Sequence, residues 1–232
     1  MLQEAQASGV RLEALYVTKL AYASYPCIAH IESAGAPVYL VDQRTLARLS
    51  DLETPSGVLA VTAMRLLPVA AILEQSAPVL LLADLNNPGN AGTLMRSAEA
   101  FGIGGVIFGN SGVQPHHPKV VRSAMGSFFR MNVAVASPAS VREAAHTRGF
   151  LTFGSDARGE RIDRIALTGR TIIAVGHERR GLAQWASICD RRISISMKGR
   201  VESLNAAVAG SIVLYEASKG DWRDAGDAVK TV

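Results

Sequence analysis

The sequence has little of what marks a secreted, membrane-embedded or disulfide-stabilised protein. It contains two cysteines, Cys27 and Cys189, which lie far apart and in no metal-ligand spacing. The apolar runs, such as residues 78–83, are far shorter than the roughly 18 to 20 residues that a membrane-spanning helix needs. The first residues, MLQEAQASG, contain no basic region followed by an apolar one, so no secretory signal is predicted. These absences predict a protein of the reduced cytoplasm without a membrane segment.

Two common signatures of chemistry are also missing. Residues 177–181 read HERRG, and a zinc-binding HExxH motif would need a second histidine where Gly181 stands. The glycines Gly102, Gly104 and Gly105 do not complete a G-x-G-x-x-G fingerprint after a strand. We therefore expect no metal ion and no dinucleotide-binding site, which disfavours a nucleotide-dependent oxidoreductase.

The charge balance is mildly basic. The chain of 232 residues carries 24 Lys and Arg against 20 Asp and Glu, a net charge of +4. Many of the basic residues fall into three clusters, which are residues 158–170, 179–180 and 191–200. A polyanionic partner would explain these clusters, and a solvated charged surface would explain them equally well.

The first part of the chain has the pattern of a small α/β unit, which we place at residues 1–65. Strands are expected at residues 12–18, 37–42 and 56–64, with a short helix at 27–35. Residues 1–9 look like the end of a helix without a preceding strand, so we expect the chain to start inside a domain. Residues 66–77 carry weaker signals and are predicted to form a linker, in which residues 67–75 could form a connecting helix.

The second part has the pattern of a mostly parallel sheet. Six apolar runs, separated by helical patterns, occur at residues 79–84, 105–108, 132–136, 150–154, 171–176 and 192–197. Continuous apolar runs indicate strands that are covered on both faces, as in parallel α/β sheets. This domain is placed at residues 78–220, with Ser203 capping its last helix and Gly220 ending it. Residues 221–232 are predicted to be a loosely held tail.

Three segments of this domain contain candidate functional residues. In residues 83–102 a strand runs through a turn into a helix, on which Arg96 lies opposite the apolar face and Asn90 lies near the start. Arg96 could be an ordinary surface arginine and Asn90 an ordinary helix cap. In residues 174–182 a buried strand leads into a glycine-flanked loop whose one acid is Glu178.

The third segment, residues 193–219, runs from a strand through a basic glycine loop into a helix. The helix opens with Ser203-Leu204-Asn205 and continues with small residues, which allow another backbone to approach closely. Close packing of this helix on the sheet would explain the small residues as well as a ligand site would.

Taken together, the three segments resemble the three motifs of the SPOUT superfamily of RNA methyltransferases, specifically its TrmH-type ribose 2′-O branch. The matching residues are Asn90 and Arg96 in the first motif, Gly176, Glu178, Gly181 and Leu182 in the second, and Ser203 to Asn205 in the third. The resemblance covers about residues 78–219. Residues 1–65 are similar, more loosely, to the ribosomal-protein-like RNA-binding domain that often precedes such catalytic domains. One departure is His177, where an asparagine commonly stands.

This resemblance implies a deep trefoil knot in the parallel sheet, a homodimer, and S-adenosylmethionine as the methyl donor. It implies that Gly154, Gly176, Ile195, Met197 and Leu204 contact the donor. It also implies a catalytic set of Arg96, Asn90, Glu178, Ser203 and Asn205. Arg96 would hold the phosphate beside the target ribose and stabilise the developing alkoxide, since a guanidinium is essentially never deprotonated. The other four would orient the ribose, the loop and Arg96.

Three further basic residues, Lys119, Arg122 and Arg130, are candidates for contacts with RNA phosphates, although a solvated helix face would explain them equally. The favoured function is 2′-O-methylation of large-subunit ribosomal RNA, because tRNA-modifying members often carry helical extensions instead of an amino-terminal RNA-binding domain. A tRNA ribose methyltransferase is the nearest alternative. A non-catalytic RNA-binding or ribosome-assembly protein that retains the knot is the alternative from another class.

Overall fold

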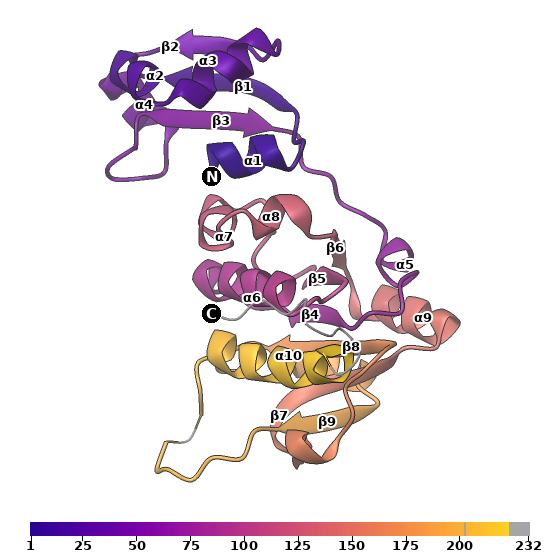
Figure 1. Ribbon diagram of the computed structural model, residues 1–232. Helices are drawn as coiled ribbons and strands as arrows, with labels where there is room; N and C mark the ends of the chain where they lie inside the picture. The colour runs from indigo at the N-terminus through magenta and orange to yellow at the C-terminus, as the bar shows by residue number, and fades with distance from the viewer. Residues whose placement is uncertain (202, 223–232) are drawn as a thin grey trace. The chain divides into compact units, whose positions relative to one another are not determined.

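The strands form two separate sheets, one in each of two compact units, residues 1–65 and 66–232 (Figure 1). The computed structural model describes residues 1–201 and 203–222. In the first unit, β1 (Leu12–Val17) lies between β2 (Val38–Leu40) and β3 (Val58–Thr62), parallel to β2 and antiparallel to β3. The helices of this unit are α1 (Leu2–Ala7), α2 (Lys19–Ser24), α3 (Pro26–Ser33) and α4 (Gln43–Leu49). The three predicted strands and the predicted helix are confirmed.

Among the described residues, the second unit contains a six-stranded sheet in the order β6-β5-β4-β8-β7-β9, and every neighbouring pair is parallel. This confirms the predicted parallel sheet; the knot stays a prediction. The strands are β4 (Val79–Ala83), β5 (Gly105–Gly109), β6 (Val133–Ala136), β7 (Leu151–Arg161), β8 (Thr171–Gly176) and β9 (Arg191–Ser194).

Two groups of helices cover this sheet. Helices α6 (Pro88–Ala100), α7 (Pro118–Ser123), α8 (Ser127–Arg130) and α10 (Ala206–Trp222) belong to one group, in which α6 contacts the other three. Helix α9 (Pro138–Arg148) contacts both α5 (Val69–Ile72) and the 3₁₀ helix η2 (Ala183–Ile188) in the other group. A second 3₁₀ helix, η1 (Ile162–Arg164), follows β7. All five residues of β4 are buried, as expected for a strand covered on both faces.

Several sequence-based boundaries are wrong. Residues 66–77, predicted as a linker, contain α5 where a connecting helix was considered, but Val69, Ile72 and Leu73 are buried in the core of the second unit. Gly220 does not end the last helix, because α10 continues to Trp222. The predicted tail therefore overlaps α10 at residues 221–222, and residues 223–232 lie outside the described part of the chain.

The crossing of α6 and α7 depends on a glycine. Gly92 is buried on α6, and a Cβ there would lie 2.6 Å from the carbonyl oxygen of Val120 and 2.8 Å from the amide nitrogen of Ala124. Only a residue without a side chain allows the two backbones to approach this closely. The position of Asn90 at the start of α6 therefore depends on Gly92 two residues later.

We predict that Gly92→Ala lowers the free energy of unfolding by about 1–3 kcal/mol, because the added methyl group overpacks the helix crossing. Urea denaturation followed by circular dichroism measures this change. Thr93→Ala, an exposed neighbour on the same helix, serves as the control and should leave the unfolding free energy nearly unchanged. Equal stability of Gly92→Ala and the wild-type chain would contradict the role given to Gly92.

Candidate active site at the carboxyl edge of the parallel sheet

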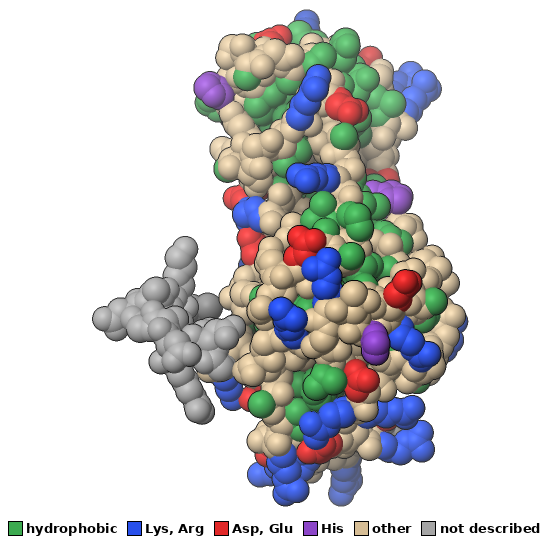
Figure 2. Space-filling view, turned by 90° about the vertical axis from the view of Figure 1, so that its right-hand side faces the viewer, with side chains coloured by type: hydrophobic (Ala, Val, Ile, Leu, Met, Phe, Trp, Pro, Cys, Tyr) green, Lys and Arg blue, Asp and Glu red, His purple; other side chains and the backbone are tan. Residues whose placement is uncertain are grey.

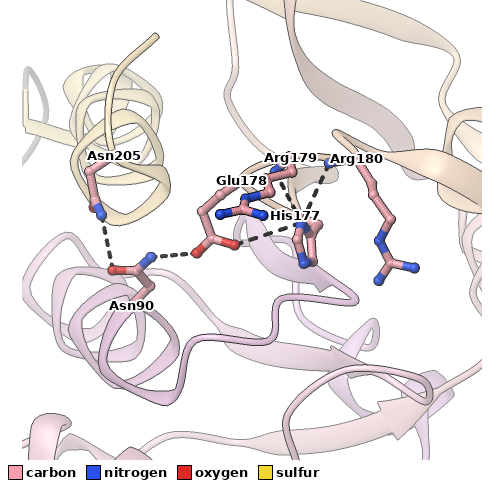
Figure 3. Close-up of polar contacts among 6 residues, drawn as sticks. All are labelled: Asn90, His177, Glu178, Arg179, Arg180 and Asn205. Carbon is pink, nitrogen blue, oxygen red and sulfur yellow. Dashed lines mark hydrogen bonds and ion pairs between the residues drawn. The ribbon is translucent and has the colours of Figure 1, made fainter.

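Side chains from all three motifs meet at one point of the second unit. Asn90 is in the first turn of α6, Glu178 is in the loop after β8, and Asn205 directly precedes α10. The Asn90 Nδ2 donates a hydrogen bond of 2.5 Å to Glu178 Oε1. The Asn205 Nδ2 donates one of 3.2 Å to Asn90 Oδ1 (Figure 3). Asn90 therefore connects two segments that lie 88 and 115 residues away in the sequence.

The side chain of Asn90 is available for these bonds because another residue caps α6. Asn87 is the N-cap, and its Oδ1 accepts from the amide groups of Gly89 and Asn90 at 2.9 and 3.2 Å. Pro88 follows as the first helical residue, where its lack of an N–H costs nothing. Asn90 is thus not the helix cap, which was the alternative interpretation of the sequence.

The loop after β8 is a tight turn that holds Glu178 against α6. The backbones of His177 and Gly181 exchange two hydrogen bonds of 2.9 and 2.8 Å, and Gly181 has a φ of +57°. The His177 Nδ1 accepts from the amide groups of Arg179 and Arg180 at 3.0 and 3.4 Å (Figure 3). The same Nδ1 lies 3.9 Å from Glu178 Oε2. His177 therefore shapes the turn from within.

Asn205 has two functions at the start of α10. Its Oδ1 accepts from the amide groups of Ala207 and Val208 at 2.9 and 3.2 Å, so Asn205, and not Ser203, caps the helix. The predicted capping role of Ser203 is wrong for this reason. The Nδ2 of the same side chain reaches Asn90. The side-chain amide of Asn205 therefore caps the amino end of α10 and also links α10 to α6.

Arg96 and Ser203 are close in sequence to this network but do not take part in it. Arg96 is exposed on α6, whereas Ala91, Leu94 and Ala98 are fully buried, as the helical pattern predicted. Within the described part of the chain, Arg96 has no side-chain hydrogen bond or ion pair. Ser203 is exposed in the segment before α10. Both side chains are accessible to a ligand.

The network lies where the strand order of the sheet reverses, between β4 and β8. Strands β4 and β8 are neighbours, with Ala83 paired to Gly176, so their carboxyl ends are level. The chain leaves β4 toward α6 and leaves β8 toward η2, which belong to different groups of helices. Ligands of open parallel sheets bind in the crevice at such a point. Asn90 lies in the first turn of the helix that follows β4, and Glu178 lies in the loop directly after β8.

The residues predicted to contact the methyl donor follow the same edge. Gly176 ends β8, and Ile195, Met197 and Leu204 lie between β9 and α10. Met197 is 40% exposed, and Ile195 and Leu204 are half-buried, so apolar side chains are accessible there. Gly154 is different: it is buried in β7, where a Cβ would lie 2.7 Å from Cys189 Sγ. Close packing against Cys189 therefore requires a glycine at this position, whether or not Gly154 also contacts the donor.

A buried acid that the sequence interpretation did not single out holds the surrounding loops. Asp84, at the end of β4, is 6% exposed and has a φ of +53°, which is unusual for a residue other than glycine. Its Oδ1 accepts from the amide of Ser111 at 3.1 Å, and its Oδ2 accepts from Gln184 Nε2 at 2.8 Å. Asp84 therefore joins the loops after β4, β5 and β8. The sequence signal that could have identified Asp84 is an acidic residue directly after an entirely apolar strand.

Comparison with known protein families agrees with this geometry. Residues 77–215 match the model of the SpoU rRNA Methylase family. This chain belongs to that family. Residues 1–66 match a second model, described as RNA 2′-O ribose methyltransferase substrate binding. The resemblance predicted from the three motifs is confirmed.

Individual relatives of this SpoU-family chain support the assignment. It is 39% identical over 140 residues to the 23S rRNA (uridine(2479)-2′-O)-methyltransferase of Streptomyces viridochromogenes. That match covers 56% of this chain and 48% of the relative, so it spans about half the relative's length. The 23S rRNA (guanosine(2553)-2′-O)-methyltransferase RlmP of Bacillus subtilis is 28% identical over 183 residues, 78% of this chain and 72% of that protein.

Solved structures agree in fold. The SpoU methyltransferase AviRb from Streptomyces viridochromogenes has a TM-score of 0.83 and 27% identity, over 96% of this chain and 87% of that one. The complex of AviRb with the cofactor AdoMet has a TM-score of 0.80 and 28% identity, over 97% and 88%.

The predicted phosphate-binding residues of this SpoU-family chain differ in availability. Lys119 is exposed on α7, Arg122 is half-buried there, and Arg130 on α8 forms an ion pair with Glu99. The hydrogen bond from Arg130 is the main reason why the pKa of Glu99 lies below its ordinary value. Binding of RNA phosphate by Arg130 would compete with this ion pair.

Two of the three basic clusters come together through the pairing of β7 with β9. Figure 2 shows Lys and Arg side chains gathered at the end of the second unit where Figure 1 places these strands. Part of this positive charge is neutralised by ion pairs between the two strands. Asp156 of β7 forms an ion pair with Arg192 of β9, and Glu160 of β7 forms one with Arg191 of β9.

Among residues 1–201 and 203–222, no helix is long and apolar enough to cross a membrane. The same ranges contain no cluster of three or more His, Cys, Asp and Glu side chains that could hold a metal ion.

We predict that Asp84→Ala lowers the free energy of unfolding by about 1–3 kcal/mol, because the Ser111 amide and the Gln184 side chain lose their acceptor. Urea denaturation measures the loss. Asp84→Asn keeps one acceptor and tolerates the left-handed backbone, so its loss should be smaller. Equal losses for the two variants would show that the hydrogen bonds do not hold the loops.

Proposed function

We propose that this chain transfers a methyl group from S-adenosylmethionine to a ribose 2′-hydroxyl of RNA, with large-subunit ribosomal RNA as the substrate. The observation that carries the proposal is the Asn90-centred network, which joins the three SpoU motifs at the carboxyl ends of β4 and β8. The named 23S rRNA 2′-O-methyltransferases among the relatives and the substrate-binding model over residues 1–66 support ribosomal RNA as the substrate. Because that substrate is cytoplasmic in bacteria, we also propose a cytoplasmic location.

The residues at the carboxyl edge fit the methyl donor. Gly176 has no side chain and leaves its backbone groups approachable, while Ile195, Met197 and Leu204 offer apolar contacts for the adenosine and the aliphatic chain. When bound, S-adenosylmethionine supplies an electrophilic methyl group on a sulfonium centre. Contact between Gly154 and the donor stays a prediction, since packing already accounts for this glycine.

Arg96 is proposed to hold the RNA. Its exposed guanidinium, which has no partner within the described residues, can bind the phosphate beside the target ribose with two parallel hydrogen bonds. It also stabilises the negative charge that develops on the 2′-oxygen as the O–C bond forms and the C–S bond breaks. The 2′-proton passes to a phosphate oxygen or to water. Arg96 cannot accept it, because its guanidinium group is already protonated and does not lose a proton.

The remaining residues of the proposed set orient the reacting groups. Glu178 uses one carboxylate oxygen for Asn90 and retains acceptor capacity for a ribose hydroxyl. Asn90 and Asn205 fix the position of that carboxylate relative to α6 and α10. Ser203 is exposed beside this point and can contribute its hydroxyl. Positioning of this kind lowers the barrier without chemical participation.

We predict that Arg96→Ala lowers kcat/KM for methylation of purified ribosomal RNA by about 100-fold or more, because charge stabilisation in the transition state is lost. Transfer of labelled methyl from S-adenosylmethionine to separate rRNA and tRNA fractions measures the effect. Calorimetric titration with the donor and thermal unfolding should be unchanged, because Arg96 is exposed.

Arg11→Ala removes an exposed arginine of the first unit and is the control, for which rates should match the wild type. Retained turnover in Arg96→Ala would refute the role of Arg96. Label confined to tRNA would refute the proposed substrate, and the absence of both donor binding and label would favour the non-catalytic alternative.

We further propose a homodimer formed through the face shared by α6 and α10. A groove of about 520 Å³ lies on this face beside Asn90 and Asn205. Among the apolar side chains that line it, Val208 is 49% exposed, Tyr215 is 41% exposed and Phe101 packs edge-on against Tyr215 at 5.7 Å. Exposed apolar side chains gathered next to a site are typical of a surface that a second copy covers.

We predict that Val208→Glu shifts the chain from dimer to monomer, because association would bury an unpaired carboxylate. Sedimentation equilibrium measures the mass. Val201→Glu is the control, because the Val201 side chain is 62% exposed and does not line the groove. The chain with this substitution should remain dimeric. A dimer that persists in Val208→Glu would place the interface elsewhere.

A further inference from the structure

The first unit contains a pocket that the proposed chemistry does not use. It has a volume of about 830 Å³, and it opens where β1 and β2 end and β3 begins. Its walls are the start of α2, the loop between β2 and α4, and residues 55–57. Since β1 and β2 are parallel, both carboxyl ends meet here, as they do at ligand sites of other α/β sheets.

Hydrogen bonds fix the walls of this pocket. The amide of Thr18 donates to the carbonyl of Gly57 at 2.9 Å, and the amide of Val41 donates to the carbonyl of Val17 at 2.9 Å. The Gln43 Nε2 donates to the carbonyl of Pro55 at 3.3 Å. The shape of the pocket is therefore set before any ligand arrives, which lowers the entropic cost of binding.

Apolar and aromatic groups dominate the mouth of the pocket. Leu20 is 78% exposed, Leu40 is 58% exposed and Tyr25 is 44% exposed. Among the lining residues the only charged ones are Lys19 and Asp42, which balance each other. Neutral polar side chains such as Ser24 and Ser56 complete the lining. The ligand must therefore be flat or apolar, with hydrogen-bonding groups at its edge and no strong charge in the pocket.

The charge of the whole unit leads to the same conclusion. Residues 1–65 carry five Lys and Arg against six Asp and Glu, a net charge of −1, whereas residues 66–232 carry nineteen against fourteen, a net charge of +5. A surface that binds RNA through its phosphates needs an excess of Lys and Arg. The first unit has none, although its family model is described as substrate binding. Unpaired bases, by contrast, bind by stacking on aromatic side chains and by hydrogen bonds to their edges.

We propose that this pocket binds an unstacked nucleobase of single-stranded RNA, with the base against Tyr25 and the apolar side chains of Leu20 and Leu40. The first unit would then select an exposed loop or bulge of the substrate, while the basic second unit supplies the phosphate contacts. This inference rests on the proposed RNA substrate, but it does not depend on methyl transfer.

The test measures binding of the 232-residue chain to a short, mixed-sequence, fluorescein-labelled single-stranded RNA by anisotropy, and to the same RNA annealed to its complement. Tyr25→Ala should weaken single-strand binding by about 5- to 150-fold, which corresponds to the 1–3 kcal/mol of one stacked base. Duplex binding should not change. The salt dependence of single-strand binding should keep its slope, because no phosphate contact is removed.

Three further variants keep the result interpretable. Tyr39→Ala removes another exposed tyrosine of the first unit, one that stacks on Tyr16 outside the pocket, and should bind like the wild type. Tyr25→Phe retains the ring and should also retain affinity. Leu20→Ser changes a largely exposed side chain, so it should weaken single-strand binding without affecting thermal unfolding.

Unchanged single-strand affinity in both Tyr25→Ala and Leu20→Ser would overturn the inference and leave a protein as the occupant of the pocket. Equal loss for single-stranded and duplex RNA, or a reduced salt slope, would overturn it as well. If the wild-type chain methylates no RNA but the Tyr25 effect remains, the proposed function fails and the pocket assignment stands.

Discussion

The candidate site depends on the parallel pairing of β4 with β8. Two strands that are far apart in the sequence lie side by side in this register, with Ala83 opposite Gly176. The loops that follow them therefore emerge at the same level and lead to different groups of helices, which is the arrangement at which parallel sheets bind ligands. Asn90 and Glu178 lie on these two segments, and a one-residue shift in register would separate them. The buried side chain of Asp84 joins the segments that follow these strands and β5, through hydrogen bonds from Gln184 and Ser111.

The third motif reaches this crevice through Asn205. Its side chain uses its oxygen to cap α10 and its nitrogen to bind Asn90, so the start of the last helix and the edge of the sheet are fixed together. The segment before it contains Ile195, Met197 and Leu204, which are proposed to contact the donor. The proposed donor and ribose sites therefore meet at Asn205. This arrangement explains why three dispersed short motifs together indicate one activity, although each alone is weak.

Much of the fold could be predicted from the sequence because parallel strands covered on both faces give continuous apolar runs, and all six were found. Helix ends were harder to predict, because side-chain caps compete: Asn205 caps α10 although Ser203 is an equally good candidate by type, and Gly220 lies inside the helix. The short helix α5 could be anticipated only as a possible connecting helix over residues 67–75, because burial against the sheet, rather than its own sequence, stabilises it. The motifs identified Asn90, Glu178 and Asn205, but not Asp84, whose function depends on partners 27 and 100 residues away.

The central claim is that this site methylates the ribose rather than the base of RNA. The most direct measurement is to incubate the 232-residue chain with ribosomal RNA and labelled S-adenosylmethionine, digest the RNA to nucleosides, and identify the labelled product by mass spectrometry. All label is expected in a 2′-O-methylated nucleoside, and before digestion the phosphodiester bond that follows the labelled ribose should resist alkaline cleavage. Label in a base-methylated nucleoside would contradict the account.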